Sequence, residues 1–258
     1  MSGPRVVEFH DGFETGRLDA DRWVDAYLPQ WSSRRRAAPT WAIADGRLVL
    51  EIPPEQEPWC PEWDGDLRVS SIQTGVFAGP LGSPIGQHRF APDVVVREAQ
   101  EERRQYTPRY GRIEIRAAAT AAPGAMVALW MIGFEDRPDD SGEICVMEIF
   151  SRDIGPGRAA VGMGVHPHHD PRLVDDFERV EAAIDATEAH DYAAEWTPAG
   201  VAWEIDGRTV RTTRQSPGYP MQLMLGLYAF GPVPNDGPRP RFVVESVRGI
   251  APAEGRTK

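Results

Sequence analysis

Turn-forming residues interrupt the apolar segments of this chain at short intervals. Glycine occurs 25 times and proline 24 times among 258 residues, and they separate short runs rich in β-branched and aromatic side chains. No long apolar stripe has the 3.6-residue period of an amphipathic helix. These features predict an all-β sandwich. At 41% hydrophobic content the chain can bury one sizeable core, so we expect a single domain over residues 1–258 without internal repeats.

Many short segments have the composition of strands and are bounded by turn formers. They are residues 6–9, 47–52, 112–118, 127–132, 144–150, 160–166, 191–196, 201–205, 209–213, 221–228 and 242–247. The pair Asp206-Gly207 between two of them predicts a two-residue hairpin turn, in which the glycine supplies a positive φ. We expect little helix, with a turn or two at most in residues 180–189.

Two glutamates, Glu143 and Glu148, lie in one otherwise apolar segment. A buried carboxylate costs free energy unless a partner or a reaction requires it, so the pair indicates chemistry; paired charges on an edge strand are the alternative. In a regular strand, Glu143 and Cys145 would share one face and Glu148 would lie on the other. One extra residue, a β-bulge, would bring all three onto one face. The carboxyl groups could then approach the roughly 5 to 5.5 Å separation of a retaining glycosidase.

The segment from Glu143 to Glu148 resembles the signature of glycoside hydrolase family 16, the laminarinase and lichenase family. That signature runs Glu, apolar, Asp, apolar, in some members one further residue, and Glu; here Cys145 replaces the Asp. Other segments match the family in order and spacing: residues 9–13, 44–50, 110–116, 128–133, 190–198, 201–207 and 220–221. Residues 59–105 match poorly and are identified as an insertion. The resemblance implies a concanavalin-like jelly-roll β-sandwich of two antiparallel sheets with a cleft on its concave face.

The resemblance also implies a mechanism. In the family, the first glutamate attacks the anomeric carbon, and the last protonates the departing oxygen and later activates water. Carrying these roles over to this chain makes Glu143 the nucleophile and Glu148 the acid/base. The expected enzyme is a retaining glycoside hydrolase or transglycosylase, similar to an endo-β-glucanase, that acts on β-linked polysaccharide or oligosaccharide. Two alternatives stay open: a catalytically impaired carbohydrate-binding jelly roll, and a scaffold reused for non-glycosidic small-molecule chemistry.

Cys145 removes a negative charge that the family's Asp would supply. The lost repulsion is about 3 kcal/mol for charges roughly 5 Å apart at an effective dielectric constant near 20. We therefore expect both glutamates to titrate lower than in a relative with Asp, and an acid-shifted pH optimum. Cys145 is a poor nucleophile itself, because two flanking carboxylates disfavour a thiolate, and we expect it to be an inert space-filling residue.

The resemblance places three candidate substrate-binding residues near the cleft. Trp130 lies where the family has a cleft-lining aromatic, and an indole can stack on the C–H face of a sugar; core packing is the alternative. Met126 stands where the family often has a second Trp, which weakens a glucan-type subsite. Trp31 lies in a polar loop near the expected donor-sugar subsite. Arg36 and Tyr228 are weaker candidates.

His166 occupies the position where the family has a histidine near the acid, and we assign it a supporting role, with an ordinary loop histidine as the alternative. Together with His168, His169 and Asp170 it suggests a metal cluster, but neighbouring loop histidines without a further spaced ligand are weak support. We expect no catalytic metal and no cofactor. The family can bind a structural calcium ion away from the cleft, yet no clearly oxygen-rich loop here offers its ligands.

The net charge of −11 disfavours nucleic acid and anionic membranes as partners. No segment is long or apolar enough to span a bilayer, and residues 1–30 lack the apolar region of a signal peptide. We expect a monomer whose partner is a carbohydrate substrate. It is cytoplasmic if Met1 is the native start and secreted if a leader was removed. With only Cys60 and Cys145 present, a disulfide framework is excluded, and we expect free thiols.

Overall fold

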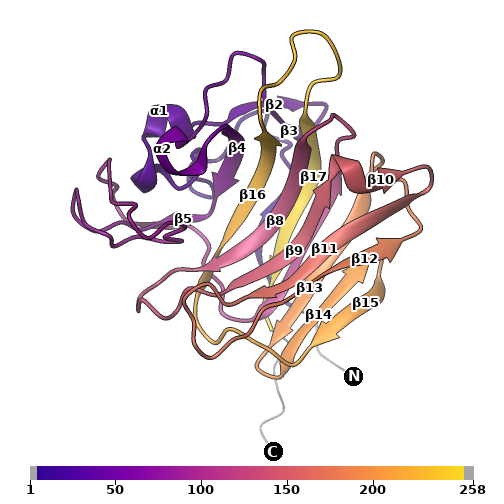
Figure 1. Ribbon diagram of the computed structural model, residues 1–258. Helices are drawn as coiled ribbons and strands as arrows, with labels where there is room; N and C mark the ends of the chain where they lie inside the picture. Colours follow the sequence, from indigo (N-terminus) through magenta and orange to yellow (C-terminus); the bar gives the residue numbers. More distant parts are fainter. Residues whose placement is uncertain (1–4, 253–258) are drawn as a thin grey trace, which may run out of the picture.

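The computed structural model describes residues 5–252 and contains two large antiparallel sheets packed as layers (Figure 1). The back sheet has the order β15-β14-β13-β7-β17-β3-β2, with β1 also paired to β17. The front sheet has the order β10-β11-β9-β8-β16-β4, with β12 also paired to β11. The predicted jelly-roll sandwich is confirmed.

The strand bounds follow the turn-forming residues. The back sheet contains β1 (Val7–Asp11), β2 (Thr40–Ala44), β3 (Arg47–Glu51), β7 (Gly111–Ala118), β13 (His190–Thr197), β14 (Gly200–Ile205), β15 (Arg208–Thr213) and β17 (Arg241–Ile250). The front sheet contains β4 (Leu67–Gln73), β8 (Ala125–Gly133), β9 (Glu143–Phe150), β10 (Ile154–Gly155), β11 (Arg158–His166), β12 (Asp176–Ala182) and β16 (Met221–Phe230). A small third sheet pairs β5 (Gly75–Val76) with β6 (Arg103–Arg104).

Helical structure is confined to short pieces within the described residues. These are α1 (Arg34–Ala37), α2 (Pro61–Asp64) and two 3₁₀ turns, Pro29–Trp31 and Ser151–Asp153. The expected helical turn at residues 180–189 is wrong, because Asp176–Ala182 forms the strand β12 and turns follow it. β12 is an edge strand, and its exposed charged residues hid the strand pattern.

The main core lies between the two sheets. Leu129 and Leu225 of the front sheet and Ile115 and Trp196 of the back sheet are among its fully buried side chains. The alternation of each strand directs every second residue into this layer. The hairpin predicted at Asp206-Gly207 is present, with φ values of 48° and 73° that match a type I′ turn.

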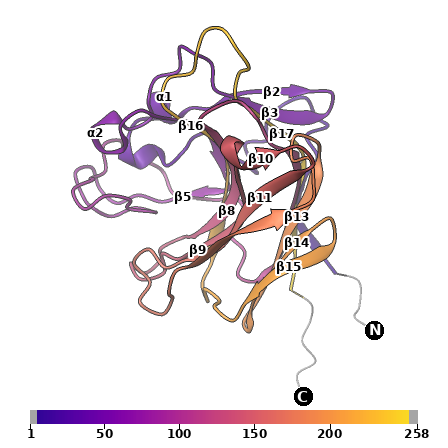
Figure 2. The same cartoon turned by 45° about the vertical axis from the view of Figure 1, so that its right-hand side comes forward.

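A second apolar cluster covers part of the outer face of the front sheet. It joins Trp31, Trp59 and Val94 to Met126 and Trp130 of β8. Both views place α1, α2 and β5 on the side of the molecule where β16 lies (Figure 2), and Figure 1 shows β4 beside them. Residues 59–105, the expected insertion, are therefore packed against the sheet and include its strand β4 (Leu67–Gln73).

Candidate active site

The strand β9 carries a β-bulge between Cys145 and Met147. Across β8, Leu129 pairs with Met147 but Trp130 pairs with Cys145, so Val146 has no partner in the register. Val146 and Met147 are both buried in the core between the sheets. Two consecutive inward residues reverse the parity of the strand, and the bulge predicted from the sequence is confirmed.

The bulge is stabilised from the opposite layer. The indole Nε1 of Trp203, on β14 of the back sheet, donates a hydrogen bond to the carbonyl of Cys145 at 2.8 Å. An irregular ladder leaves backbone groups without their usual partners, and a buried carbonyl needs another donor. Trp203 supplies that donor across the core, which holds the bulge in place.

A cavity of about 310 Å³ lies on the outer face of the front sheet, where the two glutamates meet. Of the residues that the sequence analysis placed at the cleft, Glu143, Cys145, Glu148, His166, Trp130, Met126 and Tyr228 line it. The remaining lining residues are Tyr27, Leu67, His88, Ala128, His168 and Phe230. One β-bulge thus brings both carboxyl groups to the same solvent-accessible hollow.

Glu148 has a raised pKa. Burial raises its pKa to about 7, and the negative charge of Glu143 adds to the increase, while Arg179 and Arg152 oppose it. At neutral pH a substantial fraction of Glu148 therefore holds its proton. Glu143 lies on the other side of Cys145, and its Oε2 is 2.9 Å from Nε2 of His168.

Cys145 is a buried free thiol. Its Sγ faces the carbonyl of Gly162 at 3.7 Å. Burial, followed by the charges of Glu148 and Glu143, holds the thiol pKa well above its ordinary value. A thiol in this setting stays protonated, which agrees with a space-filling role and not with a nucleophile. Cys60 is also free, and burial raises its pKa to about 11.

Trp130 forms one wall of the cavity. Its Nε1 donates a hydrogen bond to the hydroxyl of Tyr228 at 2.9 Å, and the ring of His88 meets it edge-on with centroids 5.3 Å apart. Only 6% of Trp130 is exposed, so core packing and cavity lining both apply to this residue. Met126 is 8% exposed and lies toward the Glu148 end of the strand pair.

The stacking role expected for Trp31 is wrong. Its side chain is fully buried, and its Nε1 donates a hydrogen bond to the carbonyl of Gln87 at 2.7 Å. The insertion covers this indole, since Gly86 and Gln87 pack on it and leave no face for a sugar. Arg36 is also absent from the cavity lining and forms ion pairs with Glu57 and Glu62.

His166 lines the cavity without bonding to either glutamate. Its Nδ1 lies 3.2 Å from Asp175, and its ring stacks on Phe177 with centroids 4.8 Å apart. The histidine that reaches a carboxylate is His168, which the sequence had suggested only as part of a metal cluster. The sequence-based reasoning also missed His88, which comes from the insertion.

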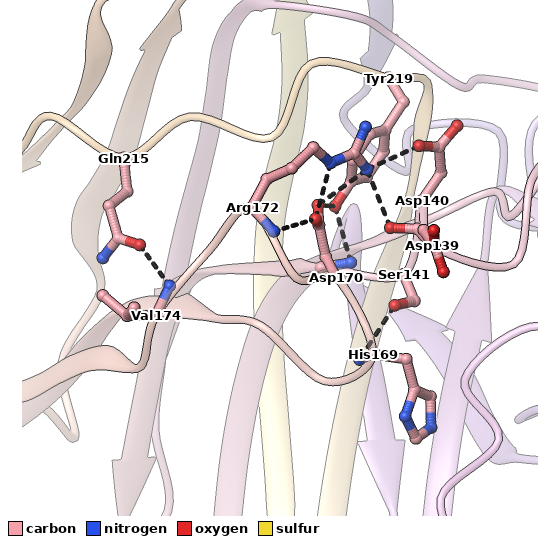
Figure 3. A network of polar contacts seen from close by, with 10 residues as sticks. Asp139, Asp140, Ser141, His169, Asp170, Arg172, Val174, Gln215 and Tyr219 are labelled. Carbon is pink, nitrogen blue, oxygen red and sulfur yellow. Dashed lines mark hydrogen bonds and ion pairs between the residues drawn. The ribbon is translucent and has the colours of Figure 1, made fainter.

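A network of polar contacts anchors the loop that carries His168 (Figure 3). Asp170 accepts hydrogen bonds from the hydroxyl of Tyr219 at 2.8 Å and from Nε of Arg172 at 2.7 Å. Arg172 also bonds to Asp140, and Tyr219 accepts the backbone N–H of Gly142, next to Glu143. Burial opposes ionisation of Asp170, but hydrogen bonds from Arg172 lower its pKa. The loop is therefore tied to the start of β9.

Another hollow lies on the outer face of the back sheet, and its charged residues are paired with one another. Arg112 contacts Glu114 and bonds to Glu204 at 2.8 Å, and Arg116 bonds to Asp191 at 3.1 Å. Such ladders of opposite charges stabilise a sheet surface. We assign this hollow a structural role.

Residues 5–252 contain no group of three His, Cys, Asp or Glu side chains placed to hold a metal ion. Over the same residues, no helix has the length and apolar character needed to cross a membrane.

The fold and the site together define a class of protein: a jelly-roll sandwich with two glutamates on a bulged strand that face one cleft. The family model for glycosyl hydrolases family 16 matches residues 100–240, and the chain belongs to this family.

Relatives and solved structures agree with this assignment. A β-glucanase from Rhodothermus marinus is 35% identical over 199 residues, which cover 68% of this chain and 66% of the relative. The GlcNAcα1-4Gal releasing endo-β-galactosidase from Clostridium perfringens superimposes with a TM-score of 0.82 at 27% identity, over 97% of this chain and 63% of that one. The chain thus spans about two thirds of the length of both proteins. The fold is shared by the laminarinase catalytic domain from Thermotoga petrophila RKU-1. That structure matches with a TM-score of 0.67 at 18% identity, over 98% of this chain and 99% of that one.

Proposed function

We propose that this protein is a retaining glycoside hydrolase that cleaves β-linked glycans, with Glu143 as the nucleophile and Glu148 as the acid/base. The observation that carries the proposal is the bulge in β9, which places both carboxyl groups in one cavity. Membership of glycosyl hydrolases family 16 supports the same reaction class.

The raised pKa of Glu148 suits the acid/base role in this reaction. A retaining enzyme needs one ionised carboxylate for attack and one protonated carboxyl group for the leaving oxygen. Burial and the neighbouring charge raise the pKa of Glu148 to about 7, so this group can hold a proton near neutral pH.

The reaction then has two displacements. An oxygen of Glu143 attacks the anomeric carbon, the glycosidic C–O bond breaks, and the proton of Glu148 passes to the departing oxygen. In the second step Glu148 removes a proton from water, the water oxygen bonds to the anomeric carbon, and the ester to Glu143 breaks. Attack by a sugar hydroxyl in place of water would give transglycosylation.

The structural relatives favour β-galactoside linkages as a second substrate class beside β-glucans. The endo-β-galactosidase from Clostridium perfringens matches nearly the whole chain at 27% identity. Met126 lines the cavity where a glucan-type subsite would often have a stacking Trp. A panel of soluble β-glucans, galactans and mucin-type glycans, scored for new reducing ends, separates the two classes.

Trapping of the covalent intermediate tests the mechanism. A 2-fluoro glycoside of the sugar that the panel identifies should label Glu143, as peptide mass spectrometry would show, and Glu143→Gln should remove the label. For Glu148→Ala, azide should restore turnover of an aryl glycoside, because an activated leaving group needs no acid and azide replaces the activated water. Binding of glycans without turnover or labelling would point to a carbohydrate-binding jelly roll and contradict the proposal.

A further inference from the structure

The position between the two glutamates supplies no carboxyl group. Cys145 occupies it, and its Sγ faces the carbonyl of Gly162 and not Glu143. A neutral, buried thiol is a weak hydrogen-bond donor and does not orient a carboxylate. A nucleophile that must meet the anomeric carbon within a fraction of an ångström still needs a positioning partner.

Two of the other donors in the cavity are engaged with groups other than Glu143. Trp130 donates its Nε1–H to Tyr228, and the Nδ1 of His166 pairs with Asp175. His168 directs its Nε2 at Oε2 of Glu143, 2.9 Å away. An ionised carboxylate only accepts hydrogen bonds, so an attacking Glu143 requires that His168 carry its proton on Nε2.

The ring of His168 is held by packing from the insertion. His88 meets it edge-on, with centroids 4.7 Å apart, and His88 is itself packed on Trp130. The backbone N–H of His88 donates to Oε1 of Glu135, a carboxyl group whose pKa burial raises to about 7. Burial and the three neighbouring histidines lower the pKa of His88 to about 3, so its ring stays neutral and does not repel a charged neighbour.

The backbone at this end of the cavity is strained. His88, Glu135 and His168 have φ values of 51°, 60° and 45°, in the left-handed region that non-glycine residues seldom adopt. Strain of this kind persists only where surrounding contacts enforce it, and it is concentrated at functional sites. The anchored loop around Asp170 provides such contacts for His168.

We propose that His168 is the positioning residue for Glu143, a role that the resemblance to glycoside hydrolase family 16 would assign to a carboxyl group at the position of Cys145. The inference rests on the proposed function, because it assumes that Glu143 is the nucleophile. His168 touches Glu143 and is not itself a group that forms or breaks a bond.

The test measures the rate at which a 2-fluoro glycoside labels Glu143 in His168→Ala, His168→Gln and the control His169→Ala. His169 neighbours His168, but its ring faces the backbone of Arg89. Removal of a hydrogen bond to a charged group should slow labelling by about 10- to 100-fold in His168→Ala. The amide N–H of glutamine should restore the rate to within about fivefold of the wild type. Labelling of His168→Ala at the wild-type rate, or equal slowing in both His168 variants, would overturn the proposal.

A second substitution, at Cys145, tests whether a carboxyl group at this position and His168 perform the same role. In the His168→Ala background, Cys145→Asp should raise the labelling rate by at least about tenfold. Cys145→Asn, which has the shape of Asp without its carboxyl group, should raise it less. Melting temperatures of all variants should match that of His169→Ala within a few degrees, which separates positioning from folding. Equal recovery by Asp and Asn would refute the idea that a carboxyl group and His168 perform the same role.

The two proposals fail in different ways. An unlabelled wild-type protein without turnover refutes the proposed function, and the positioning role is refuted with it. A wild-type protein labelled at Glu143, together with a fully active His168→Ala variant, refutes the positioning role alone.

Discussion

Substitution of Cys145 by Asp should move the alkaline limb of the pH–activity profile upward. Activity falls as Glu148 loses its proton, and its pKa lies near 7. A new negative charge disfavours that loss, so the pKa of Glu148 must rise. The sign does not depend on the exact geometry, because Cys145 and Glu148 line the same cavity.

The size of the shift follows from Coulomb's law. Neighbouring side chains on one face of a strand start roughly 7 Å apart, and two side chains inclined toward each other can bring their charges to about 5 Å. At an effective dielectric constant near 20, two charges at that distance repel by about 3.3 kcal/mol, or about 2.4 pKa units. This is an upper bound, because the introduced carboxyl group would be buried and would hold a proton part of the time. We expect the limb to rise by about one pH unit.

The assay is kcat/KM against pH for the wild type, Cys145→Asp and Cys145→Asn, since kcat/KM reports ionisation of the free enzyme. Asn has the shape of Asp without its charge, so its alkaline limb should coincide with that of the wild type. The reasoning would be refuted by an Asp variant whose limb stays in place or moves down, or by an Asn variant that shifts as far as Asp.

Three further substitutions test the placement of individual side chains. Trp31→Phe should cost about 1 to 3 kcal/mol of the free energy of unfolding and leave KM unchanged, because the indole is buried under Gly86 and Gln87; a raised KM with unchanged stability would contradict this. Gly164→Ala should lower stability by about 2 kcal/mol or more in urea unfolding, because its new Cβ would collide with the carbonyl of Asp176, whereas Gly157→Ala meets no atom within 4 Å and should cost less. Phe230→Ala should raise KM about fivefold with little effect on stability, because the ring is 55% exposed and lines the cavity; loss of stability without a change in KM would show a packing role instead.

The sequence predicted the sheets because local signals agreed with the tertiary structure. Short β-branched runs ended at turn formers such as Asp206-Gly207, and the same residues form the hairpins of the back sheet. The bulge was also predictable, since two glutamates at odd spacing can share a face only if the parity of the strand changes. The structure confirms this change of parity, because Val146 and Met147 are consecutive residues and both lie in the core.

β4 escaped sequence-based prediction because its burial depends on polar partners. β4 contains Ser70, Ser71 and Gln73, all fully buried, where a strand pattern would require apolar residues. Ser70 donates to the carbonyl of Thr40, and the side chain of Gln73 accepts the backbone N–H of Leu28. The hydrogen-bond partners of these buried polar side chains lie about 30 to 45 residues away in the sequence. A local sequence pattern therefore cannot predict these hydrogen bonds.

The same limit applies to the aromatic and histidine residues of the site. Trp31 lies in a polar loop, as an exposed stacking residue would, and only the packed insertion makes it a core residue. His168 was visible as one of several loop histidines, but its bond to Glu143 depends on the return of the β11–β12 loop across the sheet. His88 reaches the same point from a segment that does not resemble the family. In this protein the bulged strand supplies the two glutamates, and the divergent insertion supplies the packing around one of them, so substitutions in residues 59–105 should alter catalysis as well as stability.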